Sequence, residues 1–392
     1  MVIERARALA ATLALLVGTL ALVGADQPRE PYTIDAIIPL TGSSAYSGQI
    51  HATSLRIYES VANASGGIRG RPVHFEIHDD HSSPVIAVQL VTELLAKNPQ
   101  LIMGSTYIAG CAAEEPLVRN GPVEFCFSPG LVTTQHNVFA SSVANTYIIP
   151  ATLKFIRERK YARLAVISAT DASGSVADRI TLTALARPEN KNLAAVDYEH
   201  FNPTDISVSA QTARIKAGNP QAIIVYATGS AFGTVLRALN DAGVNIPVFT
   251  SAVNMNPIQL AQYSNFLPKE LIFNTTLAFA RDQVRDRDLR ASIDEFYAGY
   301  RRAGLEPSPE SSLSWDPAKI VVASLRALGL DATGSQLADF IGNLHGFAGA
   351  SGIYDFRNSD HHGLTDAALA FVKWVPSDKS FAVVSKPGGS PL

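Results

Sequence analysis

Short apolar runs alternate with longer amphipathic stretches along most of the chain. The short runs are rich in β-branched and aromatic residues, which favour strands, whereas the longer stretches repeat apolar residues at helical spacing. Strands are predicted at 32–39, 72–78, 100–104, 123–128, 163–168, 193–198, 221–227, 246–251 and 270–276. Helices are predicted between them at 50–64, 85–97, 147–159, 176–185, 205–217 and 231–242. This repeated alternation indicates an α/β fold in which helices cover both faces of parallel sheets.

The alternation pauses twice, at the irregular segment 133–146 and again after Thr276, where the composition becomes charged. We interpret the pauses as crossings between two Rossmann-like lobes with parallel sheets. The later helices should pack back on the first lobe, and the last strand should form a third crossing of a three-strand hinge. The late helices are predicted at 285–303, 312–328 and 335–343, and the last strands at 351–356 and 368–375. The predicted N-terminal lobe is 26–144 with 277–365, and the C-terminal lobe is 145–276 with 366–392.

The N-terminus has the pattern of a secretory signal at 1–25. Arg5 and Arg7 precede an uncharged apolar run at 8–23, and Val23 and Ala25 occupy the small-residue positions of a cleavage site. The alternative is an uncleaved anchor, but crossing a bilayer takes about 20 apolar residues and this run has 16. No cysteine lies near the cut to carry a lipid. We therefore expect a mature periplasmic protein without a lipid anchor or stable membrane insertion.

Charge and composition exclude some partners. The chain has 392 residues, of which 47% are hydrophobic and 17% charged, as in a globular protein of two domains. Removing the predicted signal leaves 30 basic and 34 acidic residues, hence a formal charge of −4. A mildly acidic, mixed surface without a basic patch argues against nucleic acid as a partner.

Ligands of open parallel sheets bind beyond the carboxyl ends of the strands. Five of the six predicted strand ends contain no ionisable side chain apart from tyrosine, and the exception carries Asp171. Small polar loops at helix N-termini offer unpaired N–H donors, which favour an anion. These ends lie at 39–48, 104–110, 128–134, 168–175, 227–231 and 250–254.

The end of the strand at 123–128 is the best candidate for such an anion site. Ser128 offers a hydroxyl, Pro129 stiffens the turn, Gly130 lets the backbone approach a carboxylate, and Leu131 adds a donor. The alternative is an ordinary turn between strand and helix, because serine, proline and glycine are common turn residues.

No catalytic motif accompanies these loops. The sequence has no G-x-S-x-G elbow, H-E-x-x-H, C-x-x-C, P-loop or dinucleotide fingerprint after a strand, so we predict neither enzyme activity nor a cofactor. Histidines and acids gather at 74–81, and His361 adjoins His362. Adjacent histidines on an extended segment point apart, and zinc needs three or four convergent ligands, so solvated edges or turns are favoured over a metal site.

Cys111 and Cys126 are the only cysteines. Cys126 lies near the end of a predicted strand and Cys111 near the start of the preceding helix, so both belong to one end of the sheet. A disulfide suits the predicted compartment. Two buried thiols remain the alternative, because spacing does not determine the separation that a disulfide requires.

Three segments, at 37–49, 66–84 and 302–325, resemble the periplasmic substrate-binding proteins of ABC importers for branched-chain amino acids. They read "IIPLTGSSAYSGQ", "GGIRGRPVHFEIHDDHSSP" and "RAGLEPSPESSLSWDPAKIVVASL". The resemblance to these two-lobed type I binding proteins covers nearly the whole mature chain. It implies a monomeric, hinge-closing receptor that delivers a small solute to the membrane subunits of a permease. A sensor subunit that reports the ligand to a membrane receptor is the alternative.

The resemblance also assigns residues of the first lobe. The carboxylate-binding positions of the family fall on Tyr107, Ser128, Gly130 and Leu131, in agreement with the loop chemistry above. The aromatic position of the first loop falls on Ser47. The predicted site of this lobe also includes Tyr46, Ser105 and Thr106.

In the second lobe the sequence departs from the family pattern. The acid that takes an amino acid's ammonium falls on Ala252, and two pocket tyrosines fall near Ser173 and Thr228. Burying an ammonium without an anion costs several kcal/mol. The resemblance therefore implies an aromatic or keto carboxylate without an α-amino group. The alternative is an amino acid whose ammonium meets Asp171 or a backbone carbonyl.

Overall fold

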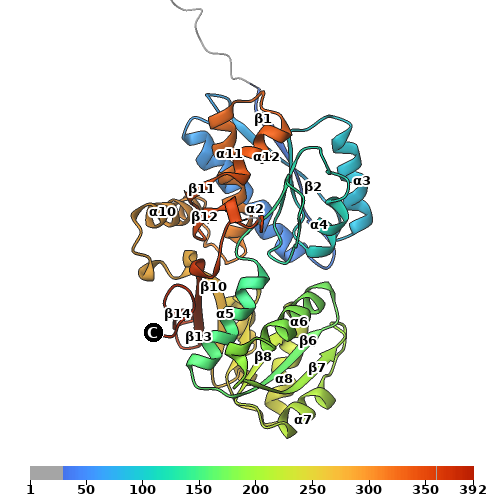
Figure 1. Ribbon diagram of the computed structural model, residues 1–392, viewed down its shortest axis with the longest axis vertical. Coiled ribbons are helices and arrows are strands. Elements are labelled where there is room, and N and C mark those ends of the chain that lie inside the picture. Colours follow the sequence, from blue (N-terminus) through green and yellow to red (C-terminus); the bar gives the residue numbers. More distant parts are fainter. Residues whose placement is uncertain (1–29, 359) are drawn as a thin grey trace, which may run out of the picture.

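The computed structural model describes residues 30–358 and 360–392, and it places two sheets one beyond the other along the long axis (Figure 1). The first sheet has five parallel strands in the order β2-β1-β3-β4-β5, and we call the part built on it lobe 1. Its strands are β1 Tyr32–Ile37, β2 Val73–His78, β3 Leu101–Gly104, β4 Val123–Cys126 and β5 Val138–Ala140. The predicted signal at 1–25 lies outside the described residues.

The second sheet has seven strands in the order β14-β13-β10-β9-β8-β6-β7 and forms lobe 2. Strands β10, β9, β8, β6 and β7 run parallel, as the sequence predicted. Strand β13 pairs antiparallel with β10, and β14 pairs antiparallel with β13; the sequence did not predict these antiparallel pairings. Strand β13 is antiparallel because the chain leaves lobe 2 towards lobe 1 along β10 and returns into lobe 2 along β13 beside it. The strands are β6 Arg163–Ala169, β7 Ala194–Phe201, β8 Ala222–Tyr226, β9 Val248–Thr250, β10 Leu271–Thr276, β13 Leu369–Val375 and β14 Ser380–Val383.

Helices cover both sheets. In lobe 1 they are α2 Ala45–Ala64, α3 Pro84–Leu95 and α4 Ile108–Glu114, and in lobe 2 they are α5 Asn145–Glu158, α6 Ala172–Leu185, α7 Ser209–Ala217, α8 Gly229–Asp241 and α9 Pro257–Gln262. Three late helices follow, α10 Arg287–Arg302, α11 Ser311–Leu328 and α12 Gly334–Gly342. Within the described ranges, none of the helices combines the length and the apolar character that crossing a bilayer requires.

The late helices pack on lobe 1, as the sequence predicted. The Ser54 hydroxyl on α2 donates to the carbonyl of Ser311 at 2.7 Å. Near the end of α11, the Arg326 guanidinium donates to the carbonyl of Gly67, just beyond the end of α2, at 2.8 Å. The two helices therefore lie side by side and run in the same direction. Trp315 of α11 is fully buried in the lobe 1 core.

The chain passes between the sheets three times, between β5 and α5, between β10 and α10, and before β13 (Figure 1). The predicted α/β architecture with two lobes is confirmed. The precise division of the chain at 144, 276 and 365 stays a prediction. The sequence missed β5, β14 and the short strand β11 His345–Ala348, which pairs with β12 Ile353–Asp355. These strands have only three or four residues, too few to show a period.

Candidate functional site

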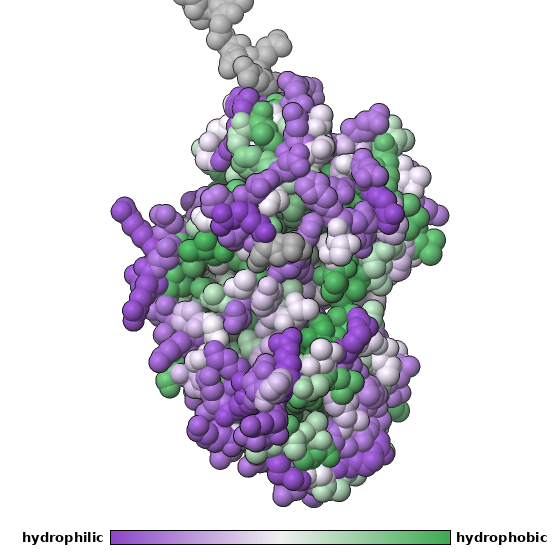
Figure 2. Space-filling model, viewed as in Figure 1, coloured by the Kyte–Doolittle hydropathy of each residue, from purple (hydrophilic) through white to green (hydrophobic). Residues whose placement is uncertain are grey.

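The strand-end loops of the two lobes meet at the waist of the molecule. Helix α4 of lobe 1 contacts α6 of lobe 2. The Asn256 side-chain amide of lobe 2 donates to the Tyr46 hydroxyl of lobe 1 at 2.7 Å. Figure 2 shows apolar surface in the notch between the lobes, on the right-hand side of this view. The loops that the sequence singled out thus come from both sides to one place, as expected for parallel sheets.

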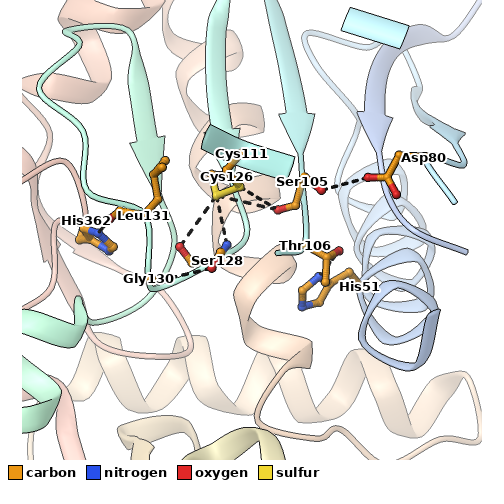
Figure 3. Close-up of a disulfide and its surroundings, with 10 residues drawn as sticks. All are labelled: His51, Asp80, Ser105, Thr106, Cys111, Cys126, Ser128, Gly130, Leu131 and His362. Carbon is orange, nitrogen blue, oxygen red and sulfur yellow. Dashed lines mark hydrogen bonds between the residues drawn. A yellow bond between two sulfur atoms is a disulfide. The ribbon is translucent and has the colours of Figure 1, made fainter. Parts of the chain in front are cut away.

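The loop after β4 forms a compact turn (Figure 3). The Gly130 N–H donates to the Ser128 hydroxyl oxygen at 3.4 Å, and the Leu131 N–H donates to the Ser128 carbonyl at 3.4 Å. Both lengths are at the long end for hydrogen bonds, so these donors can turn towards a stronger acceptor at little cost. A Cβ at position 130 would lie 2.3 Å from Ile108 Cδ1, so a larger residue there would force the Ile108 side chain of α4 to move.

In the loop after β3, the hydroxyls of Ser105 and Tyr107 point into lobe 1, whereas Thr106 points towards His51. The Ser105 hydroxyl donates to the Asp80 carboxylate at 3.0 Å, inside lobe 1. The Tyr107 hydroxyl is also buried, and burial with the nearby charges of Asp80 and Glu114 raises its pKa. Ser105 is 0% exposed and therefore cannot contact a ligand directly, contrary to the prediction, whereas Tyr107 is partly exposed apart from its hydroxyl. Thr106 Oγ1 lies 3.0 Å from His51 Nδ1, on the other side of the loop (Figure 3).

A disulfide joins Cys111 of α4 to Cys126 at the end of β4, with a Cα separation of 5.9 Å. The Ser128 N–H donates to the Cys126 sulfur at 3.3 Å, and the Cys111 sulfur lies 3.3 Å from the Ser105 carbonyl oxygen. The bridge therefore supports both first-lobe loops from behind (Figure 3).

Reducing this disulfide should lower the free energy of unfolding by about 3 kcal/mol, because the bridge closes a loop between residues 15 apart and restricts the unfolded chain. Urea unfolding of the oxidised protein, the reduced protein and the double variant C111A/C126A measures this. The reduced protein and the variant should agree. An equal midpoint for oxidised and fully reduced protein would contradict the prediction.

Two buried acids lie beside the disulfide. Glu114 of α4 is 0% exposed and Glu124 of β4 is 1% exposed, and the two carboxyl groups face each other. Burial, followed by the charge of Asp80, raises the pKa of Glu114 to about 8. Burial, followed by the charge of Glu114, raises the pKa of Glu124 well above its ordinary value. The pair therefore binds protons more tightly than glutamates in water do. The sequence signal that could have predicted it is a single acid inside the apolar run "VEFCF".

The predicted residues of lobe 2 are more open. Ser173 and Thr228 are exposed, and Ala252 is half-buried. Asp171, the alternative acid, caps α6, because its carboxylate accepts the Gly174 N–H at 2.8 Å. Its charge is thus already engaged by a helix N-terminus.

Glu310, which precedes α11, was not predicted as a site residue. It is 4% exposed, and its carboxyl group lies near the Ser47 hydroxyl. Burial raises its pKa to about 7. It also lies close enough to Tyr46 for its charge to raise the pKa of that phenol, after burial. Nothing in the segment "PSPESS" marks this glutamate as buried, since the packing of α11 on α2 places it there.

The histidines pair with separate partners. His78 lies 2.7 Å from an Asp35 oxygen, and His74 contacts Glu59 and Glu76. The ring nitrogens of His361 and His362 lie 2.9 Å from the carbonyls of Val138 and Leu131, respectively. His362 thus ties the third crossing to the loop after β4 (Figure 3). Over the residues 30–358 and 360–392, no three His, Cys, Asp or Glu side chains converge as metal ligands would.

Comparison with known proteins agrees with this architecture. In fold the chain is similar to an extracellular ligand-binding receptor from Rhodopseudomonas palustris, with a TM-score of 0.77, 19% identity and coverage of 91% of this chain and 100% of that one. LivJ from Streptococcus pneumoniae, in complex with isoleucine, is similar with a TM-score of 0.74 and 16% identity, and the match covers 90% of this chain and 99% of that one. The leucine-binding protein LivK from Thermotoga maritima has a TM-score of 0.73 and 17% identity, and the match covers 90% of this chain and 97% of that one.

These identities establish a shared fold and nothing about a ligand. No protein of curated function matches the chain significantly. The family model described as periplasmic binding protein matches residues 31–380, which is nearly the whole described chain. The resemblance seen in the sequence is thereby confirmed. The chain belongs to the periplasmic binding protein family.

Proposed function

We propose that this protein is the extracytoplasmic solute-binding component of an ABC importer, and that it binds a small carboxylate between its lobes without chemical turnover. One observation carries the proposal: small polar loops from both sheets meet at the waist, with Ser128 and two weakly held amides on the lobe 1 side. Closure requires a ligand that contacts both lobes, since only differential affinity favours the closed state.

The carboxylate is expected at the loop after β4. The Ser128 hydroxyl has a hydrogen to donate, and the amides of Gly130 and Leu131 can turn from their 3.4 Å contacts towards a charged oxygen. Thr106 and Tyr107, both partly exposed, complete this side of the site, while the fully buried Ser105 supports their loop from inside. From lobe 2, the exposed residues Ser173 and Thr228 and the half-buried Ala252 face the ligand.

An aromatic or keto acid is the favoured ligand class. Ala252 offers no charge, and one Asp171 oxygen already accepts the Gly174 N–H at the start of α6, so an α-ammonium at Asp171 would have to share that carboxylate with the helix N-terminus. LivJ binds isoleucine on the same fold, and an amino acid is therefore the rival outcome of the test below. The partners would be the membrane subunits of the permease. The protein would act as a periplasmic monomer, with residues 26–144 and 277–365 as one lobe and 145–276 and 366–392 as the other.

Thermal unfolding of the chain from Asp26 onward tests this function against panels of aromatic carboxylates, keto acids and aliphatic amino acids. A ligand present at about 100 times its dissociation constant should stabilise the folded state by about 2.7 kcal/mol and raise the melting temperature measurably. Matched alcohols that lack the carboxylate are the control and should give no shift. If leucine or valine alone raises the midpoint, the ligand class is wrong. If no acid does, the carboxylate site is wrong.

A further inference from the structure

We propose that Glu310 and Ser47 form a second polar subsite in the cleft wall of lobe 1, which takes a hydrogen-bond donor at the end of the ligand remote from its carboxylate. This inference rests on the proposed function, because it assumes a carboxylate at the loop after β4. It assigns the ligand a distal hydroxyl or amino group.

The packing of α11 on α2 puts Glu310 at the cleft end of lobe 1. The helices run in the same direction, as the bonds from Ser54 to Ser311 and from Arg326 to Gly67 show. The starts of both helices therefore lie at the same end of the lobe. Helix α2 starts directly after the loop that follows β1, and this loop belongs to the strand-end side. Glu310, the residue before α11, shares that end.

Side-chain contacts connect Glu310 to the carboxylate site. The His51 ring lies against the Glu310 backbone carbonyl, and its Nδ1 lies 3.0 Å from Thr106 Oγ1. The same ring packs edge-on against Phe127, the neighbour of Ser128, with ring centroids 5.4 Å apart. One imidazole thus separates Glu310 from the loops that would hold the carboxylate. The subsite is close to that anion site but distinct from it.

On its other side Glu310 adjoins the rim of the cleft. Its carboxyl group lies near the Ser47 hydroxyl and near Tyr46, whose hydroxyl accepts the bond from Asn256 of lobe 2. Ser47 adjoins Tyr46 in the chain, so a ligand that reaches from Ser128 to Tyr46 would also come near Ser47. This direction places the distal end of the ligand at Glu310.

The hydrogen-bonding capacity of Glu310 is not filled by the protein. A carboxylate has about four acceptor positions, and the nearby Ser47 hydroxyl has a single hydrogen and can fill at most one of them. Within the described part of the chain, no lysine, arginine or histidine forms an ion pair with it. A buried acid with free acceptor positions is costly unless a partner arrives, and a donor group of the ligand would supply that partner.

Three linear acids test the inference by titration calorimetry: hexanoate, 6-hydroxyhexanoate and 6-aminohexanoate. An aromatic series, 3-phenylpropionate and 3-(4-hydroxyphenyl)propionate, repeats the test in a second shape. In at least one series, a distal donor should strengthen binding about tenfold over the unsubstituted acid. Preference for the hydroxyl or for the amino member identifies the donor.

Variants of Glu310 test whether this residue causes the preference for acids with a distal donor. Glu310→Leu should abolish the tenfold preference while leaving the affinity for the unsubstituted acid within about twofold. Glu310→Gln keeps an acceptor oxygen and the shape, so it should retain preference for a hydroxyl but not for an ammonium. Glu306→Gln, an exposed acid in the same loop, is the matched control and should change nothing. Melting temperatures identify any variant that fails to fold.

Two results would overturn the inference. If substituted and unsubstituted acids bind wild-type protein equally in both series, the subsite is wrong while the carboxylate site stands. If the preference persists unchanged in Glu310→Leu, another residue takes the donor. A complete failure of every acid to bind would instead reject the proposed function, and the inference with it.

Discussion

The free energy of unfolding should fall as the pH rises from about 6.5 to about 9, because Glu114 and Glu124 must then ionise inside lobe 1. Burial raises the pKa of Glu114 from 4.5 to about 8 in the folded state. Between these values the folded protein holds more protons than the unfolded chain. The stabilisation is therefore complete below about 4.5 and is lost as the pH rises through about 8. The loss should be on the order of a few kcal/mol.

The variant Glu124→Gln isolates this pair. A glutamine amide donates to the Glu114 carboxylate and removes the repulsion between two negative charges, so the decline above pH 6.5 should be much smaller. Urea midpoints at pH 6.5, 8 and 9 measure it, in a range clear of His51, whose pKa burial lowers to about 3. Glu93→Gln, on the exposed side of α3, is the control. An equal decline in wild type and Glu124→Gln would show that the pair does not titrate.

The position of the pair connects stability to binding. Glu114 and Glu124 bridge the same helix and strand as the disulfide between Cys111 and Cys126. That helix and strand carry the two first-lobe loops of the candidate site. Repulsion between the ionised acids would push α4 away from β4 and loosen both loops, so ligand affinity should weaken over the same pH range.

Replacing Ser128 should have the largest effect on binding. Ser128→Leu puts an apolar side chain where the carboxylate is expected and removes the hydroxyl, and we expect at least a 100-fold loss of affinity. Ser128→Ala removes only the hydroxyl and should cost about tenfold to 100-fold, as for a hydrogen bond to a charged group. Calorimetry with the best ligand of the panel measures both losses.

A matched control and a folding check complete this test. Ser60→Ala, on an exposed turn of α2, should bind as wild type does. Cooperative melting of each variant is the folding check, since Ser128 is only 5% exposed and the loop must accommodate the new side chain. If Ser128→Leu folds and binds within twofold of wild type, the carboxylate is not held at this loop, and the simple turn interpretation is correct.

The strands of both lobes could be predicted because the central ones are buried on two faces and read as continuous apolar runs, whereas the edge strand β2 alternates apolar and polar residues. The predicted run at 72–78 became β2 at Val73–His78, and 163–168 became β6 at Arg163–Ala169. Strand β5, with three residues, was missed because its place is set by pairing with β4 and not by its own pattern. The antiparallel strand β13 was predicted as a strand, but its direction depends on where the chain re-enters lobe 2.

Some features of the candidate site could likewise be predicted from local sequence, and others depended on tertiary contacts. Loop chemistry at 128–131 and the family resemblance were readable locally, because small polar residues at strand ends adjoin one another in any parallel sheet. Local sequence could not predict the burial of Glu124 or the inward direction of the Tyr107 hydroxyl, since both depend on how α4 covers β4. Glu310 was outside the reach of local reasoning, because it approaches Ser47 only when α11 packs on α2.

The sequence by itself therefore determined the α/β class, the two lobes, the family and the small polar loops at the strand ends. These features follow from periodicity and from local residue chemistry, which need no knowledge of distant contacts. Only the tertiary structure decided which side chains face the cleft, which acids are protonated and how the sheet of lobe 2 ends. Those properties depend on burial and on contacts between segments far apart in the chain, and neither is encoded in any one stretch of residues.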